Sequence, residues 1–407
     1  MVLFLHNRYR TTGGEERAVG DLLWLVREQL REPAELLTRS SAELARPRAA
    51  LGLLRGGLDP DEVARAVRAG GARVVHAHNL QPTLGWRALA AARAAGARVV
   101  LHLHQYRLVC AIGVCFTRGA ECTRCHGRDT LPGVRLNCRG NLPEAAAYAS
   151  SLALWQRRLV EQADALVVPS AFARERLREL GAPLPWERVH VLAPPIRALA
   201  APAEVAPVPS KRAEAGGAEA RGSGEVADGS APKLGSYALV VARLAPEKGI
   251  DVAIDACRSA GLPLVVAGDG PELAVLQERA ARGGRGAPAG AIAQVRFAGR
   301  VDDAELARLR AGASIALVPS RSAETFGLAA AEAMAAGLPV VASRVGALPE
   351  LVEKGSLVPP NDSDALARAI GRLAGDRAAG ERGLARVRTL CAPEVVADAL
   401  AQLYDGA

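Results

Sequence analysis

The chain has 407 residues, enough for two or three domains of about 150 residues each, which excludes a small disulfide-held fold. Half of the residues are apolar and 23% are charged, so the composition is that of a folded globular chain and excludes wholesale disorder. The formal charge of +8 favours anionic partners, while the scarcity of aromatic residues (3%) argues against stacking platforms for single-stranded nucleic acid.

Short apolar runs alternate with Ala-, Leu- and Arg-rich stretches of helical period along the chain. Because the runs are almost continuously apolar, both faces of the resulting sheets should be covered by helices. This pattern predicts an α/β fold of doubly wound parallel sheets. The expected strands lie at 2–6, 72–78, 97–104, 165–169, 237–242, 263–268, 294–299, 314–319 and 338–343.

Two adjacent glycines, Gly13 and Gly14, follow the first expected strand. Such a loop allows a ligand to approach the backbone closely, and it opens a helix at Glu15. The first residues carry no long apolar core followed by a small-residue cleavage site, and no stretch reaches the ~18 apolar residues of a membrane span. We therefore expect a cytoplasmic protein that can touch the inner face of the membrane.

Five of the seven cysteines fall between residues 110 and 138. In a reducing compartment this crowding favours metal binding over disulfides. Cys122 and Cys125 form a chelating Cys-x2-Cys pair, and Cys110 and Cys138 flank it, so a structural zinc site on these four thiolates is expected. A reduced, metal-free loop is the alternative, and the pattern alone does not choose four ligands among the five cysteines and His126.

The periodic pattern collapses into Ala, Pro, Gly and Glu between Pro194 and Ser236. This predicts a first domain over 1–197, a linker over 198–235 and a second domain over 236–389. In open parallel sheets, ligands bind outside the carboxyl ends of the strands. The space between the two domains is therefore the expected active site.

Two cations, Arg243 and Lys248, stand five positions apart where the strand 237–242 ends. A guanidinium and an ammonium placed there could clamp a diphosphate next to a helix N-terminus. Cations in a surface loop are more often merely solvated, so this feature alone is weak.

Glu324 and Glu332 follow the strand 314–319, the first in a loop and the second about two turns inside an Ala-rich helix. The backbone amides of residues 325–328 would lie at the helix start, where they can cradle a phosphate. A carboxylate on an apolar helix needs hydrogen-bond donors, and ribose hydroxyls would suit it. The alternative is that Glu324 caps the helix and Glu332 is an exposed acid.

The ordered series of these motifs resembles the retaining nucleotide-sugar glycosyltransferases of family 4, which have two Rossmann-like lobes facing a central cleft, the GT-B fold. The resemblance covers almost the whole chain outside the linker. In that family the last segment, here 390–407, packs as a helix near the first lobe. The motifs are Arg243…Lys248, Gly268-Asp-Gly-Pro-Glu272, Phe297-Ala-Gly-Arg-Val301, Glu324-x7-Glu332 and the run from Ala336 to Ser343.

The resemblance implies a role for each matching residue. Arg243 and Lys248 would hold the diphosphate of the donor in place of a metal, so no catalytic cofactor is expected. Glu324 would touch the transferred sugar and Glu332 would bind the ribose. His104, which closes the strand 97–104, would hydrogen-bond the sugar. The remaining donor-binding positions implied are Gly13, Gly14, Val301 beside the nucleobase, Thr325, Phe326, Gly327 and Leu328.

The resemblance also implies the reaction: transfer of a hexose from a UDP- or GDP-hexose with retention, in which the departing diphosphate takes the proton of the acceptor. Six arginines between residues 102 and 144 would suit a polyprenyl-diphosphate-linked or other glycan acceptor of cell-surface polysaccharide synthesis. Alternatives are an epimerase of the same fold and a zinc-ribbon protein that binds nucleic acid; the latter would leave Glu324 and Glu332 unexplained.

Overall fold

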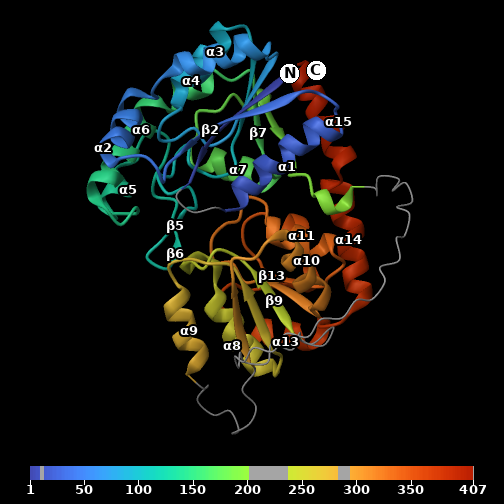
Figure 1. Cartoon of the computed structure of the whole chain (residues 1–407). Coiled ribbons are helices and arrows are strands. Elements are labelled where there is room, and N and C mark those ends of the chain that lie inside the picture. The colour runs from blue at the N-terminus through green and yellow to red at the C-terminus, as the bar shows by residue number, and fades with distance from the viewer. Residues whose placement is uncertain (10–12, 201–236, 283–293, 407) are drawn as a thin grey trace, which may run out of the picture.

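The structure is a computed structural model that describes residues 1–9, 13–200, 237–282 and 294–406. The described residues form two lobes, each built on a six-stranded parallel sheet with helices on both faces (Figure 1). The expected α/β fold with two doubly wound lobes is confirmed. Most of the expected linker, 201–235, lies outside the described residues.

The first lobe contains every expected strand of the first half, and the interior strands β3 and β7 are buried at every position because helices cover both faces. Its strands are β1 (Val2–Arg8), β2 (Ala34–Ser40), β3 (Val74–Ala77), β4 (Arg98–His102), β7 (Ala165–Val168) and β8 (Val189–Val191), with a small hairpin of β5 (Phe116–Thr117) and β6 (Ala120–Glu121). Its helices are α1 (Gly14–Glu28), α2 (Arg46–Arg55), α3 (Pro60–Gly70), α4 (Gly85–Ala94), α5 (Leu131–Arg135), α6 (Leu142–Glu161) and α7 (Ala171–Glu179), with short 3₁₀ turns η1 (Trp186–Arg188) and η2 (Arg197–Leu199).

The strand order of the first sheet is β2-β1-β3-β4-β7-β8. Within this sheet, the two strands that the sequence did not predict, β2 and β8, are the edges. An edge strand has one neighbour and needs less apolar surface, and β2 (AELLTRS) indeed carries charged and polar residues. The order reverses between β1 and β3, so the loops after these strands frame the ligand-binding point of the lobe.

The second lobe has the strand order β11-β10-β9-β12-β13-β14. Its ligand-binding point lies where the order reverses, between β9 and β12. Its strands are β9 (Ala238–Val241), β10 (Leu264–Ala267), β11 (Val295–Gly299), β12 (Ile315–Val318), β13 (Val340–Ser343) and the unpredicted two-residue edge β14 (Leu357–Val358). Its helices are α8 (Ile250–Ala260), α9 (Leu273–Ala281), α10 (Asp303–Gly312), α11 (Leu328–Ala335), α12 (Leu348–Leu351), α13 (Ser363–Leu373) and α14 (Arg377–Cys391), with 3₁₀ turns η3 (Pro246–Lys248) and η4 (Lys354–Ser356).

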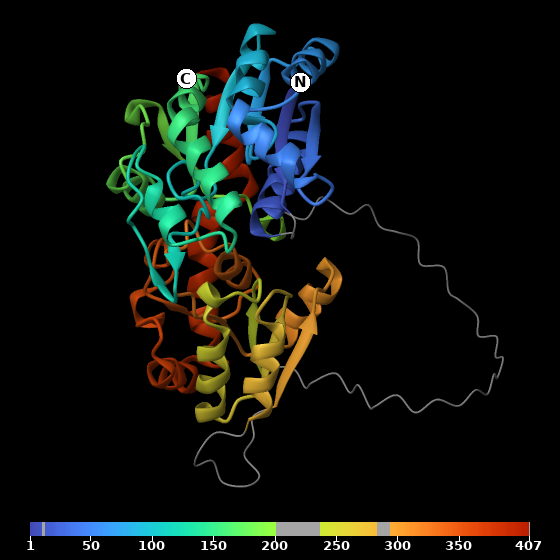
Figure 2. The same cartoon turned by 90° about the vertical axis from the view of Figure 1, so that its left-hand side faces the viewer.

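The last two helices join the lobes. Helix α14 packs on α11 of the second lobe, and α15 (Pro393–Asp405) runs up against the first lobe, so that both termini lie at the same end of the molecule (Figures 1 and 2). On that lobe α15 buries Val396, Leu400 and Tyr404 against α1 and the sheet. The helix expected over 390–407 therefore begins at Pro393, after the last turn of α14.

Candidate functional site

The reversal point of the second sheet brings together the loops that follow β9 and β12. Arg243 lies just after β9, and Lys248 ends the turn η3 directly before α8. Gly249, which caps α8, has a φ of 63°, and a Cβ there would stand 2.1 Å from the carbonyl oxygen of Pro319. A glycine at this position is what allows the two loops to touch.

Glu324 is the centre of the polar contacts in these loops. Its Oε1 accepts from Lys248 Nζ at 2.6 Å and from Ser320 Oγ at 2.7 Å. Burial alone would favour the neutral acid, but the charge of Lys248 and these hydrogen bonds outweigh it and hold the pKa of Glu324 below its ordinary value. Arg243 is paired in turn with Glu247, which is buried. The structure thus gathers the two expected diphosphate ligands around an ionised Glu324.

Helix α11 begins at Leu328, directly after this loop, and Gly327 caps it with a φ of 100°. The first amides of a helix have no carbonyl partner within it, so the start of α11 offers donors beside Lys248 and Glu324. A Cβ on Gly14 would lie 3.7 Å from Leu328 Cδ2, which places the glycine loop of the first lobe against this helix start. The Phe326 side chain is buried in the core, so it contributes to the site only through its backbone.

Glu332 lies one turn into α11, not two as expected, because the helix starts later than the sequence pattern predicts. It is 7% exposed, and arginines approach both of its oxygens: Arg310 from α10 pairs with Oε2, and Arg17 from α1 of the first lobe pairs with Oε1. Arg17 also contacts Asp303 Oδ1 at 2.8 Å. The donors that this carboxylate needs are therefore supplied by the protein, and one of them crosses between the lobes.

Further hydrogen bonds join the lobes around the same loop. Thr325 Oγ1 donates to the carbonyl oxygen of His104 at 2.8 Å, and the Thr325 carbonyl accepts from Ser170 Oγ at 2.6 Å. Tyr106 Oη donates to the carbonyl of Ala323 at 3.1 Å. His104 and Thr325, assigned to one site from the sequence, are thus direct neighbours across the lobe boundary.

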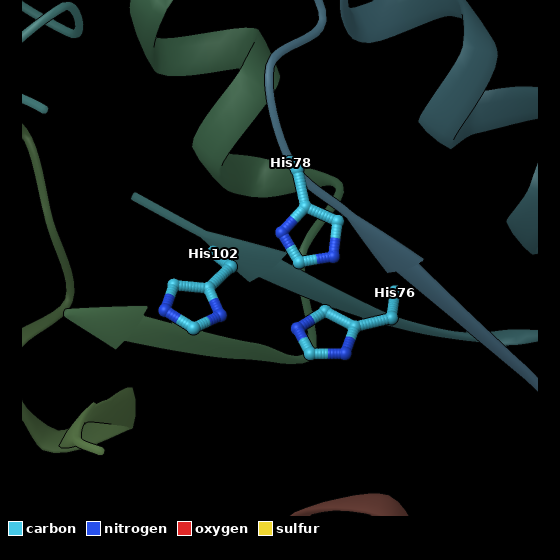
Figure 3. Close-up of side chains that lie close together, drawn as sticks. All are labelled: His76, His78 and His102. Carbon is cyan, nitrogen blue, oxygen red and sulfur yellow. The ribbon is translucent and has the colours of Figure 1, made fainter. Parts of the chain in front are cut away.

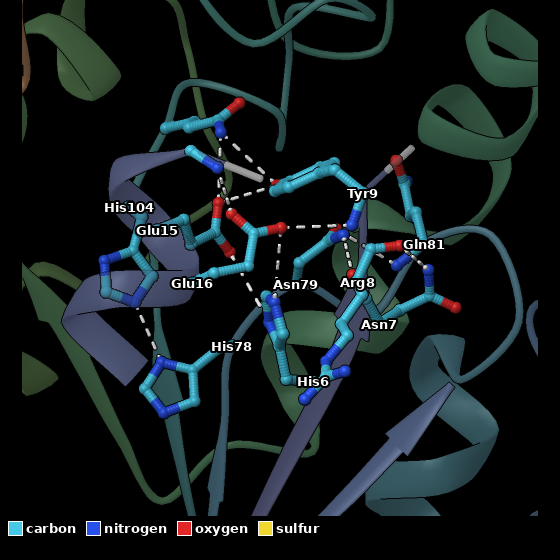
Figure 4. Close-up of polar contacts among 12 residues, drawn as sticks. His6, Asn7, Arg8, Tyr9, Glu15, Glu16, His78, Asn79, Gln81 and His104 are labelled. Carbon is cyan, nitrogen blue, oxygen red and sulfur yellow. Dashed lines mark hydrogen bonds and ion pairs between the residues drawn. The ribbon is translucent and has the colours of Figure 1, made fainter. Parts of the chain in front are cut away.

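A polar network follows β1 at the reversal point of the first sheet (Figure 4). Glu16 accepts from the amides of Gly13 at 2.7 Å and Tyr9 at 3.1 Å. Burial would raise the pKa of Glu16, but the His6 ring and these two hydrogen bonds outweigh it and lower the pKa. Glu15 accepts from Tyr9 Oη at 2.6 Å. The Gly13 amide therefore donates to a protein side chain, and Glu15 and Glu16 hold the glycine loop in place.

Below this network, His76, His78 and His102 form a buried cluster on β3 and at the ends of β3 and β4 (Figure 3). Their ring planes lie within 31° of one another, with centroids 4.5–5.5 Å apart. Burial lowers the pKa of His76 to about 3 and takes those of His78 and His102 well below their ordinary values, so the three rings are neutral. His78 Nδ1 contacts His104 Nε2 at 2.8 Å, which orients the ring of His104.

A cavity of about 80 Å³ opens beside this cluster in the first lobe. One end is polar, with Tyr9, Glu15 and His104. The rest is mostly apolar, with its floor and walls supplied by Leu53, Trp86, Leu108, Leu152, Trp155 and Leu159. The arrangement suits a ligand with a hydroxyl near Glu15 and His104 and an apolar portion farther in.

The structure also shows site residues that the sequence reasoning missed. Tyr9, Glu15 and Arg17 lie within a few residues of Gly13 and Gly14. Nothing in the local sequence, however, shows that Arg17 reaches the second lobe. Ser320 begins the motif that ends at Glu332, but the sequence assigned it no role, and the structure shows it donating to Glu324. Val301 is half-buried in the loop after β11, at the edge of the second sheet.

Family models match both halves of the chain. The model described as glycosyl transferase 4-like domain matches residues 2–195, and the one described as glycosyl transferases group 1 matches residues 227–383. Each half of the chain thus matches a glycosyltransferase domain family, and the two parallel-sheet lobes have the GT-B fold. The first matched segment covers the first lobe, and the second covers the second lobe up to the middle of α14.

Curated relatives match parts of the chain. A phosphatidyl-myo-inositol mannosyltransferase of Mycobacterium leprae is 36% identical over 148 residues, which are 34% of this chain and 37% of that protein. A D-inositol 3-phosphate glycosyltransferase of Jonesia denitrificans is 32% identical over 232 residues, 54% of this chain and 50% of the relative. The chain thus spans half or less of the length of these two relatives.

Solved structures match the whole fold at low identity. Anabaena HepE in complex with UDP has a TM-score of 0.61 at 18% identity, with 100% of both chains covered. Sucrose-phosphate synthase from Thermosynechococcus elongatus has a TM-score of 0.64 at 18% identity, with 99% of this chain and 98% of that chain covered. Among the described residues, no helix is long and apolar enough to cross a membrane.

Proposed function

We propose that this GT-B protein transfers a hexose from a UDP- or GDP-hexose to an acceptor held in the first lobe, with retention of configuration. The observation that carries the proposal is the meeting of Arg243, Lys248 and Glu324 with the start of α11 at the reversal point of the second sheet. Two cations and a helix N-terminus provide the charge that a diphosphate needs. The structurally similar HepE has been solved with UDP and with UDP-glucose, which supports a nucleotide-sugar as the donor of this protein.

In this proposal, the bond between the sugar and the diphosphate breaks while Arg243, Lys248 and the α11 amides stabilise the growing charge on the leaving group. The acceptor hydroxyl approaches the anomeric carbon from the same face and gives its proton to the departing phosphate oxygen. Glu324 holds Lys248 in position and contacts the sugar. Glu332 binds the ribose, which must share the carboxylate with Arg17 or displace it.

The acceptor is proposed to occupy the cavity of the first lobe, with a hydroxyl beside Glu15 and His104. Its apolar wall fits an acceptor with a hydrocarbon portion, so we propose a polyprenyl-diphosphate-linked glycan of cell-surface polysaccharide synthesis. The name of the Mycobacterium leprae relative also states a lipid acceptor, phosphatidyl-myo-inositol. Such a substrate would bring the protein to the cytoplasmic face of the membrane.

The donor site is tested by thermal shift with UDP, GDP, ADP and their hexose conjugates, in EDTA. One nucleotide is expected to raise the melting temperature of the wild type and of the exposed control Glu381→Ala, but not of Glu332→Ala. The absence of any shift at millimolar nucleotide in all three proteins would refute the donor site.

The chemistry is tested with the nucleotide-sugar that passes the first experiment. The anomeric configuration of the product, read by NMR, should equal that of the donor, and turnover should persist in EDTA. An inverted product would refute retention, and activity restored only by a divalent cation would refute the role of Arg243 and Lys248 as the charge partners of the diphosphate. A polyprenyl-diphosphate-linked glycan should be a better acceptor than the same glycan without its lipid.

A further inference from the structure

The five clustered cysteines of the sequence line one small enclosed space in the first lobe. This space has a volume of about 10 Å³, room for a single water-sized atom. All five thiols are free, without a disulfide. The thiol-bearing residues around it are Cys110, Cys115, Cys122, Cys125 and Cys138.

The segment that carries these cysteines has little regular secondary structure. Between residues 105 and 140, regular structure is limited to the two-residue strands β5 and β6 and the five-residue helix α5. Most residues from 118 to 129 are exposed. No residue from 118 to 129 is buried, and a stretch without an apolar core of its own often depends on disulfides or a metal for its stability.

The backbone brings the outer cysteines toward the same point. The amide of Cys122 donates to the carbonyl oxygen of Cys115 at 2.8 Å, and the amide of Cys138 donates to the carbonyl oxygen of Gly133 at 3.0 Å. A Cβ on Gly133 would lie 3.7 Å from Cys125 Sγ, so the turn that leads to Cys138 passes directly beside the Cys-x2-Cys pair.

Four of the five thiols differ from the remaining one in their surroundings. Cys115 is 1% exposed and belongs to the main hydrophobic core of the lobe, where a thiol packs as a small apolar side chain. The other four are partly exposed, and two of them, Cys110 and Cys125, pack against the edge of that core. Arginines of the same segment, among them Arg118 and Arg124, can balance the negative charge of a four-thiolate site.

We infer that Cys110, Cys122, Cys125 and Cys138 bind one structural zinc ion as thiolates. The four sulfurs must draw closer than they stand here, because among the described residues only His76, His78 and His102 bring three such atoms within 4.8 Å of one another. We assign this movement to the loop from Cys122 to Cys125, whose two central residues, Thr123 and Arg124, are exposed. Binding releases the thiol protons to solvent and changes no oxidation state.

The zinc site also bears on the neighbouring cavity. The segment that it would order begins with Gln105, Arg107 and Leu108, which form part of the cavity wall. Four protein thiolates leave no open position on the metal, so the ion stabilises this wall and takes no part in any reaction.

The test is the metal content of the full chain, purified under reducing conditions without chelator and then given zinc chloride and desalted. The wild type is expected to hold about one zinc per chain, and Cys122→Ala and Cys125→Ala less than about 0.2. Cys115→Ala and the core control Cys257→Ala should keep the metal. Cobalt loaded in place of zinc should show thiolate charge-transfer bands in the wild type and lose them in the Cys122 and Cys125 variants.

A second readout does not depend on the variants' stability. Removing zinc from the wild type with a strong chelator should speed tryptic cleavage at the arginines between 118 and 135, and adding zinc back should reverse this. Wild-type chain without zinc after loading would overturn the inference. So would zinc that survives in both Cys122→Ala and Cys125→Ala but disappears in His102→Ala, because the metal would then belong to the histidine cluster.

Discussion

Replacing Lys248 with methionine removes the cation that keeps Glu324 ionised in a mostly buried place. The side chains of Lys248 and Glu324 are 25% and 16% exposed. Breaking a fully buried pair costs about 3–5 kcal/mol, and this residual exposure reduces the expected loss to about 2 kcal/mol. For a domain of 150–250 residues, such a loss lowers the melting temperature by about 4–8 °C.

The loss should depend on pH in a defined direction. In the wild type the pKa of Glu324 is lowered, so its contribution is present above the unfolded pKa of about 4.3 and disappears as the pH falls through the folded pKa. In Lys248→Met, burial acts without the ammonium and raises the pKa of Glu324. The carboxylate then costs stability at neutral pH, and protonation relieves that cost as the pH falls. The difference between the two proteins should therefore be largest at pH 7.5 and smaller at pH 4.5.

The assay is chemical unfolding at both pH values, with three comparison proteins. Lys354→Met removes an exposed lysine of the same lobe and should leave stability unchanged. The double variant Lys248→Met/Glu324→Gln removes the orphaned charge and should recover at least half of the loss at pH 7.5. A loss that is the same at both pH values, or that the double variant does not reduce, would refute the reasoning.

Three further changes test the packing around the site. Gly249→Ala should cost more than about 2 kcal/mol in urea unfolding, because a Cβ there meets a backbone oxygen at 2.1 Å, whereas Gly261→Ala, with a similar φ and open space around it, should cost about 1 kcal/mol; equal losses would contradict the steric argument. Tyr404→Phe should cost about 1–2 kcal/mol by leaving a buried nitrogen of His76 without its 2.7 Å partner, and an unchanged unfolding midpoint would contradict this. Arg17→Ala removes contacts between the lobes and should raise the radius of gyration measured by X-ray scattering, while an unchanged value would show that the other interlobe bonds suffice.

Much of the fold could be predicted because buried parallel strands have a strong local signature. The runs at β1, β3, β4, β7, β9, β10, β11, β12 and β13 are almost continuously apolar and were all predicted. The edge strands β2, β8 and β14 were not predicted, since a strand with one neighbour is short or carries polar residues. The start of α11 was also placed too early, because the left-handed Gly327 delays the helix.

In the candidate site, too, the residues could be predicted from local sequence but their contacts could not. Residues within one strand-to-helix loop, such as Glu324 and Thr325, could be proposed from spacing and motif order. Their partners could not, because the contacts join segments more than 75 residues apart: Lys248 with Glu324, His104 with Thr325 and Arg17 with Glu332.

The sequence by itself determined the two doubly wound lobes and which loops carry phosphate- and sugar-binding chemistry, because those properties depend on the local apolar period and on residue types at strand ends. Only the tertiary structure decided how the lobes meet: it placed Arg17 on Glu332, Thr325 on the His104 carbonyl, and five cysteines around one small space. These contacts depend on sheet order and lobe orientation, which follow from the packing of distant segments and leave no periodic trace in the chain.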